Sequence, residues 1–112
     1  PNYIIAHYNL GIVFQELGES QKAMNHFQKA IQINPNHVDA HANIGMILSE
    51  LNYNHEAKKY FEKVLNLDPS RKEIYDIYGD ILLRLNQHSK ALEYIKKGVG
   101  FIRFTQKGFK II

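Results

Sequence analysis

The segments HYNLGIVF (residues 7–14) and AMNHFQKAIQINP (residues 23–35) decide the fold of this chain. In and just after the first segment, Leu10, Phe14 and Leu17 follow the spacing of an apolar stripe on an amphipathic helix. After a glycine-containing break at residues 18–20, a second stripe is formed by Ala23, Phe27, Ala30 and Ile31. The two stripes predict two short helices joined by a tight turn.

The same pattern recurs with a period of 34 residues, and the prolines Pro1, Pro35 and Pro69 share this spacing. The second copy reads HANIGMIL and AKKYFEKVLNLDP, and the third reads YDIYGDIL and ALEYIKKG, with Arg103 where a further proline is expected. A fixed period of this length is typical of stacked helical hairpins. We therefore expect helices near residues 3–16, 20–32, 37–50, 54–66, 71–84 and 88–97.

This pattern resembles the tetratricopeptide repeat family, whose signature is W-x2-L-G-x2-Y, A-x3-F and P at this period. The resemblance covers roughly residues 1–98, as three repeats at about 4–37, 38–71 and 72–98. It implies an all-α fold, an α-solenoid of three antiparallel helix-turn-helix hairpins. Residues 99–112 break the helical pattern, and we expect a short capping or docking tail there, either a β-hairpin or an extended segment.

One glycine recurs in each predicted first helix, as Gly11, Gly45 and Gly79. Glycine inside a helix costs about 1 kcal/mol relative to alanine, so a packing reason is expected. We predict close approach of the second helix, with small partners at Ala23, Ala57 and Ala91. Ser20 and Ser70 are the candidate N-caps of the helices that follow them.

The composition of the 112 residues fits one ordinary domain, with 45% hydrophobic and 22% charged residues and a net charge of +3. The absence of cysteine excludes disulfides, thiolate metal sites and a cysteine nucleophile, and suits the cytoplasm. No apolar run in the sequence is long enough to cross a membrane. We accordingly expect a cytoplasmic protein without a membrane partner.

Six histidines raise the question of a metal site, and His37 and His41 lie four residues apart. The HExxH pattern is absent, however, and no third ligand has a recognisable spacing. His7 and His41 occupy the large-residue packing phase of the repeat, so we expect packed imidazoles there. Phosphate-binding loops and nucleophile elbows are also missing, which predicts no cofactor, no metal and no catalytic activity.

Charges separate between the two kinds of predicted helix: the first helices are mainly acidic and the second helices mainly basic. The lysines of the second helices are spread over three helices, which disfavours nucleic acid as a partner. In the resembling family the first helices line the concave face, so an acidic and apolar groove is implied that binds a basic or amphipathic peptide or helix. The alternative is that these charges form ordinary solvated faces. The candidate contact residues are Tyr8, Asn9, Ile12, Glu16, Asp39, Asn43, Met46, Glu50, Glu73, Asp76 and Asp80.

Two comparisons within the family refine the expected partner. Members that hold a chaperone's C-terminal carboxylate use lysine, asparagine and arginine at five phases, which in this chain carry Tyr8, Ile12, Asn43, Glu73 and Ile77. Only the asparagine is kept, so we do not expect a chaperone C-terminal carboxylate as the partner. Asn9 and Asn43 match a ladder of amides that grips peptide backbone in the repeats of O-GlcNAc transferase, although Ile77 interrupts it.

Two further hypotheses concern the role of the chain as a whole. One is self-assembly into a homo-oligomer through the ends of the array and the tail. The other is a non-catalytic targeting segment of a larger enzyme, such as a glycosyl- or sulfotransferase. Pro1 falls at the phase of a repeat boundary, which leads us to expect a longer array.

Overall fold

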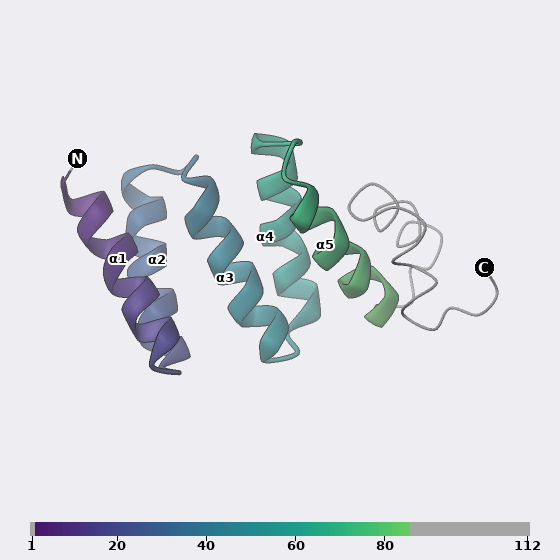
Figure 1. Ribbon diagram of the computed structural model, residues 1–112, viewed down its shortest axis with the longest axis horizontal. Helices are drawn as coiled ribbons and strands as arrows, with labels where there is room; N and C mark the ends of the chain where they lie inside the picture. The colour runs from purple at the N-terminus through teal and green to yellow at the C-terminus, as the bar shows by residue number, and fades with distance from the viewer. Residues whose placement is uncertain (1, 86–112) are drawn as a thin grey trace.

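The computed structural model describes residues 2–85, which form a row of helices without strands (Figure 1). These helices are α1 (Asn2–Glu16), α2 (Ser20–Ile33), α3 (Val38–Glu50), α4 (Asn54–Leu67) and α5 (Lys72–Arg84). The first five expected helices are confirmed, and each predicted end lies within one residue of the observed one. The expected helix near 88–97 and the tail at 99–112 lie outside the described residues.

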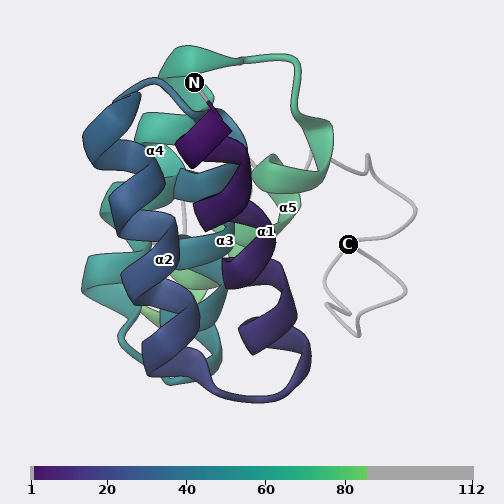
Figure 2. The same cartoon turned by 90° about the vertical axis from the view of Figure 1, so that its left-hand side faces the viewer.

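The helices form two layers, with α1, α3 and α5 on one side and α2 and α4 on the other (Figure 2). α1 packs on α2 and α3 packs on α4 as hairpins, while α2 on α3 and α4 on α5 join one hairpin to the next. Contacts therefore run mainly between helices that are adjacent in sequence, as in other stacked repeats. This architecture is the expected α-solenoid.

The core follows the repeated stripe of the second helices. Phe27 and Phe61 are fully buried at the same phase, each flanked by small residues one turn away. The first helices supply the larger aliphatic side chains, of which Ile44 and Ile81 are fully buried. The fully buried small residues of α2 and α4 are Ala23, Ala30, Ala57 and Val64. The apolar stripe predicted for the second helix is thus buried, with Ala23, Phe27 and Ala30 in the core. The stripe predicted for the first helix is not, since Leu10 and Leu17 are 42% and 66% exposed.

The repeated glycines lie against aromatic rings. A Cβ atom built on Gly11 would be 2.5 Å from Cε1 of Phe27, and one on Gly45 would be 2.9 Å from Cζ of Phe61. Both separations are shorter than real carbon contacts, so a side chain at either position would displace the ring. The predicted close approach is confirmed at Gly11 and Gly45, where the nearest atoms belong to the phenylalanine of the second helix. Ala91, the predicted partner of Gly79, lies outside the described residues.

The predicted serine caps are wrong. Glu19 and Arg71 occupy the N-cap positions of α2 and α5, and neither makes a side-chain cap bond. Ser20 is already the first residue of α2. Ser70 instead donates to the carboxylate of Asp68, from its backbone N–H at 3.2 Å and from its hydroxyl at 2.5 Å. The hydroxyl is therefore bonded within the turn around the proline and does not cap α5.

Candidate functional site

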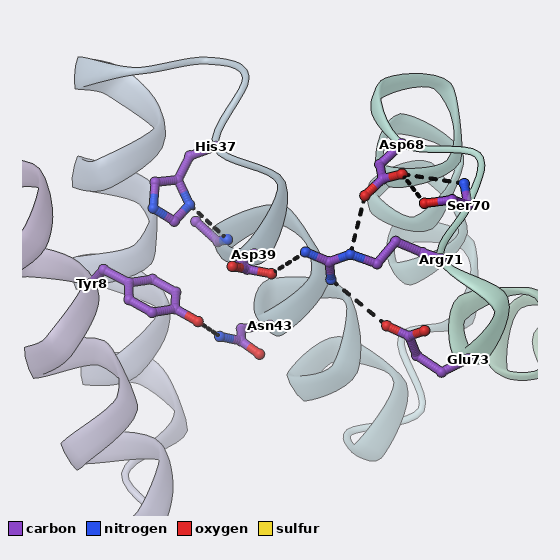
Figure 3. Close-up of polar contacts among 9 residues, drawn as sticks. Tyr8, His37, Asp39, Asn43, Asp68, Ser70, Arg71 and Glu73 are labelled. Carbon is purple, nitrogen blue, oxygen red and sulfur yellow. Dashed lines mark hydrogen bonds and ion pairs between the residues drawn. The ribbon is translucent and has the colours of Figure 1, made fainter.

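The layer of α1, α3 and α5, called here the first-helix face, carries a row of polar side chains that contact one another in two groups, Tyr8 with Asn43, and Arg71 with Asp39 and Glu73 (Figure 3). The row starts at Tyr8 on α1, continues through Asn43 and Asp39 on α3, and reaches Glu73 on α5. These four residues are among the predicted contact residues. The fold therefore places side chains from the three described first helices, α1, α3 and α5, on one face of the array.

Tyr8 and Asn43 link the first two hairpins. The amide Nδ2 of Asn43 donates a hydrogen bond of 3.1 Å to the hydroxyl of Tyr8. The tyrosine ring lies 5.0 Å from the ring of His37 and 5.5 Å from that of Phe27, centroid to centroid. The ring is thus held between the start of α3 and the core of the first hairpin.

The environment of Tyr8 keeps its hydroxyl protonated. Burial raises the pKa of Tyr8, and the negative charge of Asp39 adds to this, while the bond from Asn43 and the charge of Arg71 oppose it. A neutral hydroxyl both accepts and donates, so it can bond a partner while it accepts from Asn43. Among the described residues, Asn43 spends one N–H on Tyr8, which leaves its carbonyl oxygen and other N–H for such a partner.

Arg71 is the centre of the charged part of the row. Its Nη2 donates to Oδ1 of Asp39, its Nε lies 3.3 Å from Oδ2 of Asp68, and its Nη1 lies 3.7 Å from Oε2 of Glu73. The hydrogen bond to Asp39 and the nearby carboxylates raise the pKa of Arg71 further above its usual range. One guanidinium therefore joins α3 to the turn before α5 (Figure 3).

The cluster around Arg71 keeps a negative charge, because three carboxylates surround one guanidinium. Two bonds from Ser70 lower the pKa of Asp68 most, with a smaller effect of Arg71, so this carboxylate stays ionised. The side chains of Asp39 and Glu73 remain 51% and 63% exposed. They can therefore still meet a positive charge that arrives from solvent.

The remaining predicted contact residues differ in accessibility. Asp76 is only 8% exposed, so its carboxylate belongs to the interior of the array and not to the surface. Ile12, Met46 and Asp80 are half-buried, and Asn9, Glu16 and Glu50 are exposed.

Arg71 is the residue that the sequence reasoning missed. The sequence predicts it as the first residue of the helix near 71–84, whereas the structure places it at the N-cap of α5, just before the helix begins. The local signal was its spacing of three residues from Asp68. Its bond to Asp39 could not be read from the sequence, since 32 residues separate the two.

Four of the histidines, His7, His26, His37 and His41, are engaged in structural contacts. Nε2 of His41 lies 2.8 Å from the carbonyl oxygen of Pro35, and Nδ1 of His37 accepts from the backbone N–H of Ala40 at 3.1 Å. His41 is buried as expected, whereas His7 is only half-buried and lies beside His26. Within residues 2–85, no three histidine or acidic side chains gather in the way that holding a metal ion requires.

In the same described part of the chain, no helix combines the length and the apolar character needed to cross a membrane.

The sequence matches the family described as tetratricopeptide repeat at residues 4–37, 38–71 and 72–102. No curated protein matches it significantly. A crystal structure of MamA is similar with a TM-score of 0.82 and 24% identity, over 93% of this chain and 61% of MamA. MamA from Desulfovibrio magneticus RS-1 gives a TM-score of 0.80 and 27% identity, over 86% of this chain and 54% of that one.

A third similar structure is the second tetratricopeptide domain of Spaghetti (RPAP3), solved with the HSP90 peptide SRMEEVD. Its TM-score is 0.81 at 19% identity, over 86% of this chain and 89% of that one. The chain thus spans nearly the whole of this domain but less than two thirds of the MamA chains. At this level of identity the likeness to Spaghetti concerns the fold alone.

Proposed function

The chain belongs to the tetratricopeptide repeat family of protein–protein interaction modules, and we propose that its first-helix face binds a basic or amphipathic peptide or helix of a partner protein. The observation that carries this proposal is the cluster around Arg71. Its carboxylates outnumber the guanidinium, and two of them stay more than half exposed. Such a surface attracts cations and speeds their association.

The apolar part of the same face suits an amphipathic partner. Tyr8, Ile12 and Met46 are half-buried, so each offers part of its side chain to solvent while the rest packs on the core. Methionine adapts its shape to different apolar partners. The free donor and acceptor of the Asn43 amide can bond a peptide backbone without regard to its sequence.

The charge of the cluster also disfavours an acidic partner. The peptide bound to the Spaghetti domain, SRMEEVD, is rich in carboxylates. On this chain such a peptide would approach Asp39 and Glu73, and like charges brought together cost binding energy. We therefore propose that a chaperone C-terminal carboxylate is not the ligand of this face.

Binding of a fluorescein-labelled helical peptide of alternating lysine and leucine pairs tests the proposal. We expect the double variant Asp39→Asn, Glu73→Gln to bind this peptide roughly tenfold more weakly at low salt, mainly through slower association. Neutral replacements avoid placing a new positive charge beside Arg71. Stopped-flow fluorescence and anisotropy titration measure the rate and the affinity.

The matched control is Glu56→Gln, which removes an exposed carboxylate from α4 in the other layer. It should leave binding unchanged, and labelled SRMEEVD should bind neither protein. Equal loss of affinity in the control and in the double variant would mean that net charge alone attracts the peptide. Unchanged affinity in the double variant would refute the acidic site.

A further inference from the structure

The second hairpin carries an open pocket between its two helices. His41 of α3 and Lys59, Tyr60 and Lys63 of α4 line this pocket, which has a volume of about 250 Å³. α3 also packs on α2, and α4 also packs on α5. The pocket therefore lies within the row of helices and does not depend on where that row begins.

His41 has a ring nitrogen without a hydrogen-bond partner. The residue is 7% exposed, and its Nε2 lies 2.8 Å from the carbonyl oxygen of Pro35. A carbonyl oxygen only accepts, so Nε2 carries a hydrogen and Nδ1 of the neutral ring is an acceptor. Within residues 2–85, no group donates to this buried Nδ1. A buried acceptor without a donor is unfavourable, so a ligand that brings a proton to Nδ1 gains a bond there.

The first hairpin differs from the second at these phases of the repeat. His7 occupies the phase of His41, and its Nδ1 lies 3.2 Å from Nδ1 of His26 on the second helix. Asn25 occupies the phase of Lys59. The second hairpin thus has an additional cation and an unpartnered ring nitrogen where the first has an amide and a histidine pair.

Two positive charges lie at the pocket. Lys59 and Lys63 are four residues apart on α4, and both are exposed. No ion pair within the described part of the chain involves either of them, whereas the neighbouring Lys58 pairs with Glu62. Like charges at this spacing on a helix repel each other, so an anion in the pocket would relieve their repulsion.

The walls of the pocket are mainly apolar. The rings of His41 and Tyr60 have their centroids 5.9 Å apart at an interplanar angle of 41°, and the lysine side chains add aliphatic stems. The volume equals that of about eight water molecules at about 30 Å³ each. This is room for an aromatic ring in addition to a small anion.

We propose that the pocket between α3 and α4 binds a phosphate monoester of an aromatic alcohol. The phosphate oxygens accept from the ammonium groups of Lys59 and Lys63, and one proton is shared between a phosphate oxygen and Nδ1 of His41. The aromatic ring of the ligand packs on Tyr60. A phosphate fits better than a carboxylate, because it offers three acceptor oxygens and up to two charges and still carries a proton near neutral pH.

The probe is phenyl phosphate at pH 6.5, where a monoester with a second pKa of about 6 is still partly protonated. We expect saturable binding to the full chain in a ³¹P NMR titration. Inorganic phosphate should bind about fivefold more weakly, because it has no ring to pack on Tyr60. Absence of saturable binding, or equal affinity for inorganic phosphate, would overturn the proposal.

The double variant Lys59→Gln, Lys63→Gln should weaken binding of phenyl phosphate at least about tenfold. The matched control is Lys22→Gln, Lys29→Gln, which removes two exposed lysines from α2, one of them at the phase of Lys63. The control should bind as the parent chain does. Equal weakening in both double variants would mean that net charge alone attracts the ligand, and would overturn the site.

The variant His41→Tyr tests the ring nitrogen. Tyr75 occupies the same phase one period later and bonds the carbonyl oxygen of Pro69 at 2.9 Å, so a tyrosine at position 41 can keep the bond to Pro35. It has no counterpart of Nδ1, and we expect about tenfold weaker binding. Thermal melts confirm that the variants fold. Unchanged affinity in a folded His41→Tyr protein would refute the shared proton.

A small aryl phosphate and a phosphorylated tyrosine side chain share this chemistry, and a capped pentapeptide with phosphotyrosine between two pairs of alanines separates them. Affinity equal to that of phenyl phosphate would assign a phosphorylated side chain of a partner protein. Binding of phenyl phosphate without the peptide would assign a small molecule. The unphosphorylated peptide should not bind, and its binding with equal affinity would contradict the phosphate site. The proposal is independent of the acidic site on the first-helix face.

Discussion

At the scale of single residues, the contact between a glycine and a phenylalanine ring brings the two helices of each hairpin together. Gly11 meets Phe27 and Gly45 meets Phe61 at the same phase of successive repeats. Each glycine lowers the intrinsic stability of its helix by about 1 kcal/mol. The buried ring offsets this loss, because a fully buried phenylalanine contributes about 1.5–3 kcal/mol.

We predict that Gly11→Ala lowers the free energy of unfolding by about 1–3 kcal/mol, although alanine is the better helix former. The added Cβ would lie 2.5 Å from the Phe27 ring, which must then move. Urea denaturation followed by circular dichroism measures the change. Asn9→Ala, at an exposed position two residues earlier, is the control and should change stability little. A more stable Gly11→Ala protein would show that the ring can yield without loss.

The large residue at the start of the repeat makes a hydrogen bond in addition to its packing contacts. His41 reaches the carbonyl oxygen of Pro35 with its imidazole, and Tyr75 reaches that of Pro69 with its hydroxyl at 2.9 Å. Two different side chains thus make the same bond one period apart. Packing was expected at this phase, but the bond to the proline carbonyl is visible only in three dimensions.

At the scale of elements, α1 and α2 are joined by a pair of histidines. Nδ1 of His7 lies 3.2 Å from Nδ1 of His26, and their rings stack at 5.4 Å. The ring of Phe14 also stacks on the ring of His26, with their centroids 5.5 Å apart and an interplanar angle of 13°. The next hairpin has His41 and Tyr60 at these phases. A pair of histidines therefore occurs in the first hairpin and not in the second.

This pair predicts that the first hairpin loses stability in mild acid. Burial is the main cause that lowers the pKa of His26 from 6.5, followed by the charges of His7 and Lys29. The unfolded chain therefore binds a proton more readily than the folded one. The stability contribution is complete above pH 6.5 and is lost as the pH falls through the lower pKa of the folded state.

The variant His26→Tyr, which introduces the residue found one period later, should flatten the fall of the melting temperature between pH 7 and pH 5. Calorimetric melts across this range measure the slope. His55→Tyr, at an exposed position early in α4, is the control and should keep the parent slope. An unchanged slope in His26→Tyr would assign the acid sensitivity to other groups.

At the scale of the molecule, stability should be uneven along the row of helices. In a stacked array each unit gains stability from its neighbours, so a unit with one neighbour is weaker than a unit with two. α3 is packed on both α2 and α4, whereas α1 packs mainly on α2 among the described residues and reaches α3 through the bond of Asn43 to Tyr8. Leu10 and Val13 of α1 are accordingly 42% and 48% exposed, whereas Ile44 and Ile47 at the same phases of α3 are at most 1% exposed.

We predict that backbone amides of residues 6–13 in α1 exchange at least about tenfold faster than those of residues 40–47 in α3, after correction for intrinsic rates. The two segments occupy the same phases of the repeat, so each α1 amide has its own internal reference. Hydrogen exchange followed by mass spectrometry or NMR measures the rates. Equal protection would mean that α1 is covered in solution by another molecule.

The sequence by itself determined the five described helices, their ends to within one residue and the buried stripe of the second helices, because these features depend on spacings within one 34-residue period. It also placed Tyr8, Asn43, Asp39 and Glu73 on first helices. The tertiary structure decided how these residues meet.

The bond of Arg71 to Asp39 and that of Asn43 to Tyr8 join residues 32 and 35 positions apart. The burial of Asp76 and the exposure of Leu10 likewise depend on which helix lies next to which. The spacing of residues within one helix does not predict such contacts, because they are set by how one hairpin packs on the next. The acidic cluster around Arg71 is therefore a product of packing between repeats.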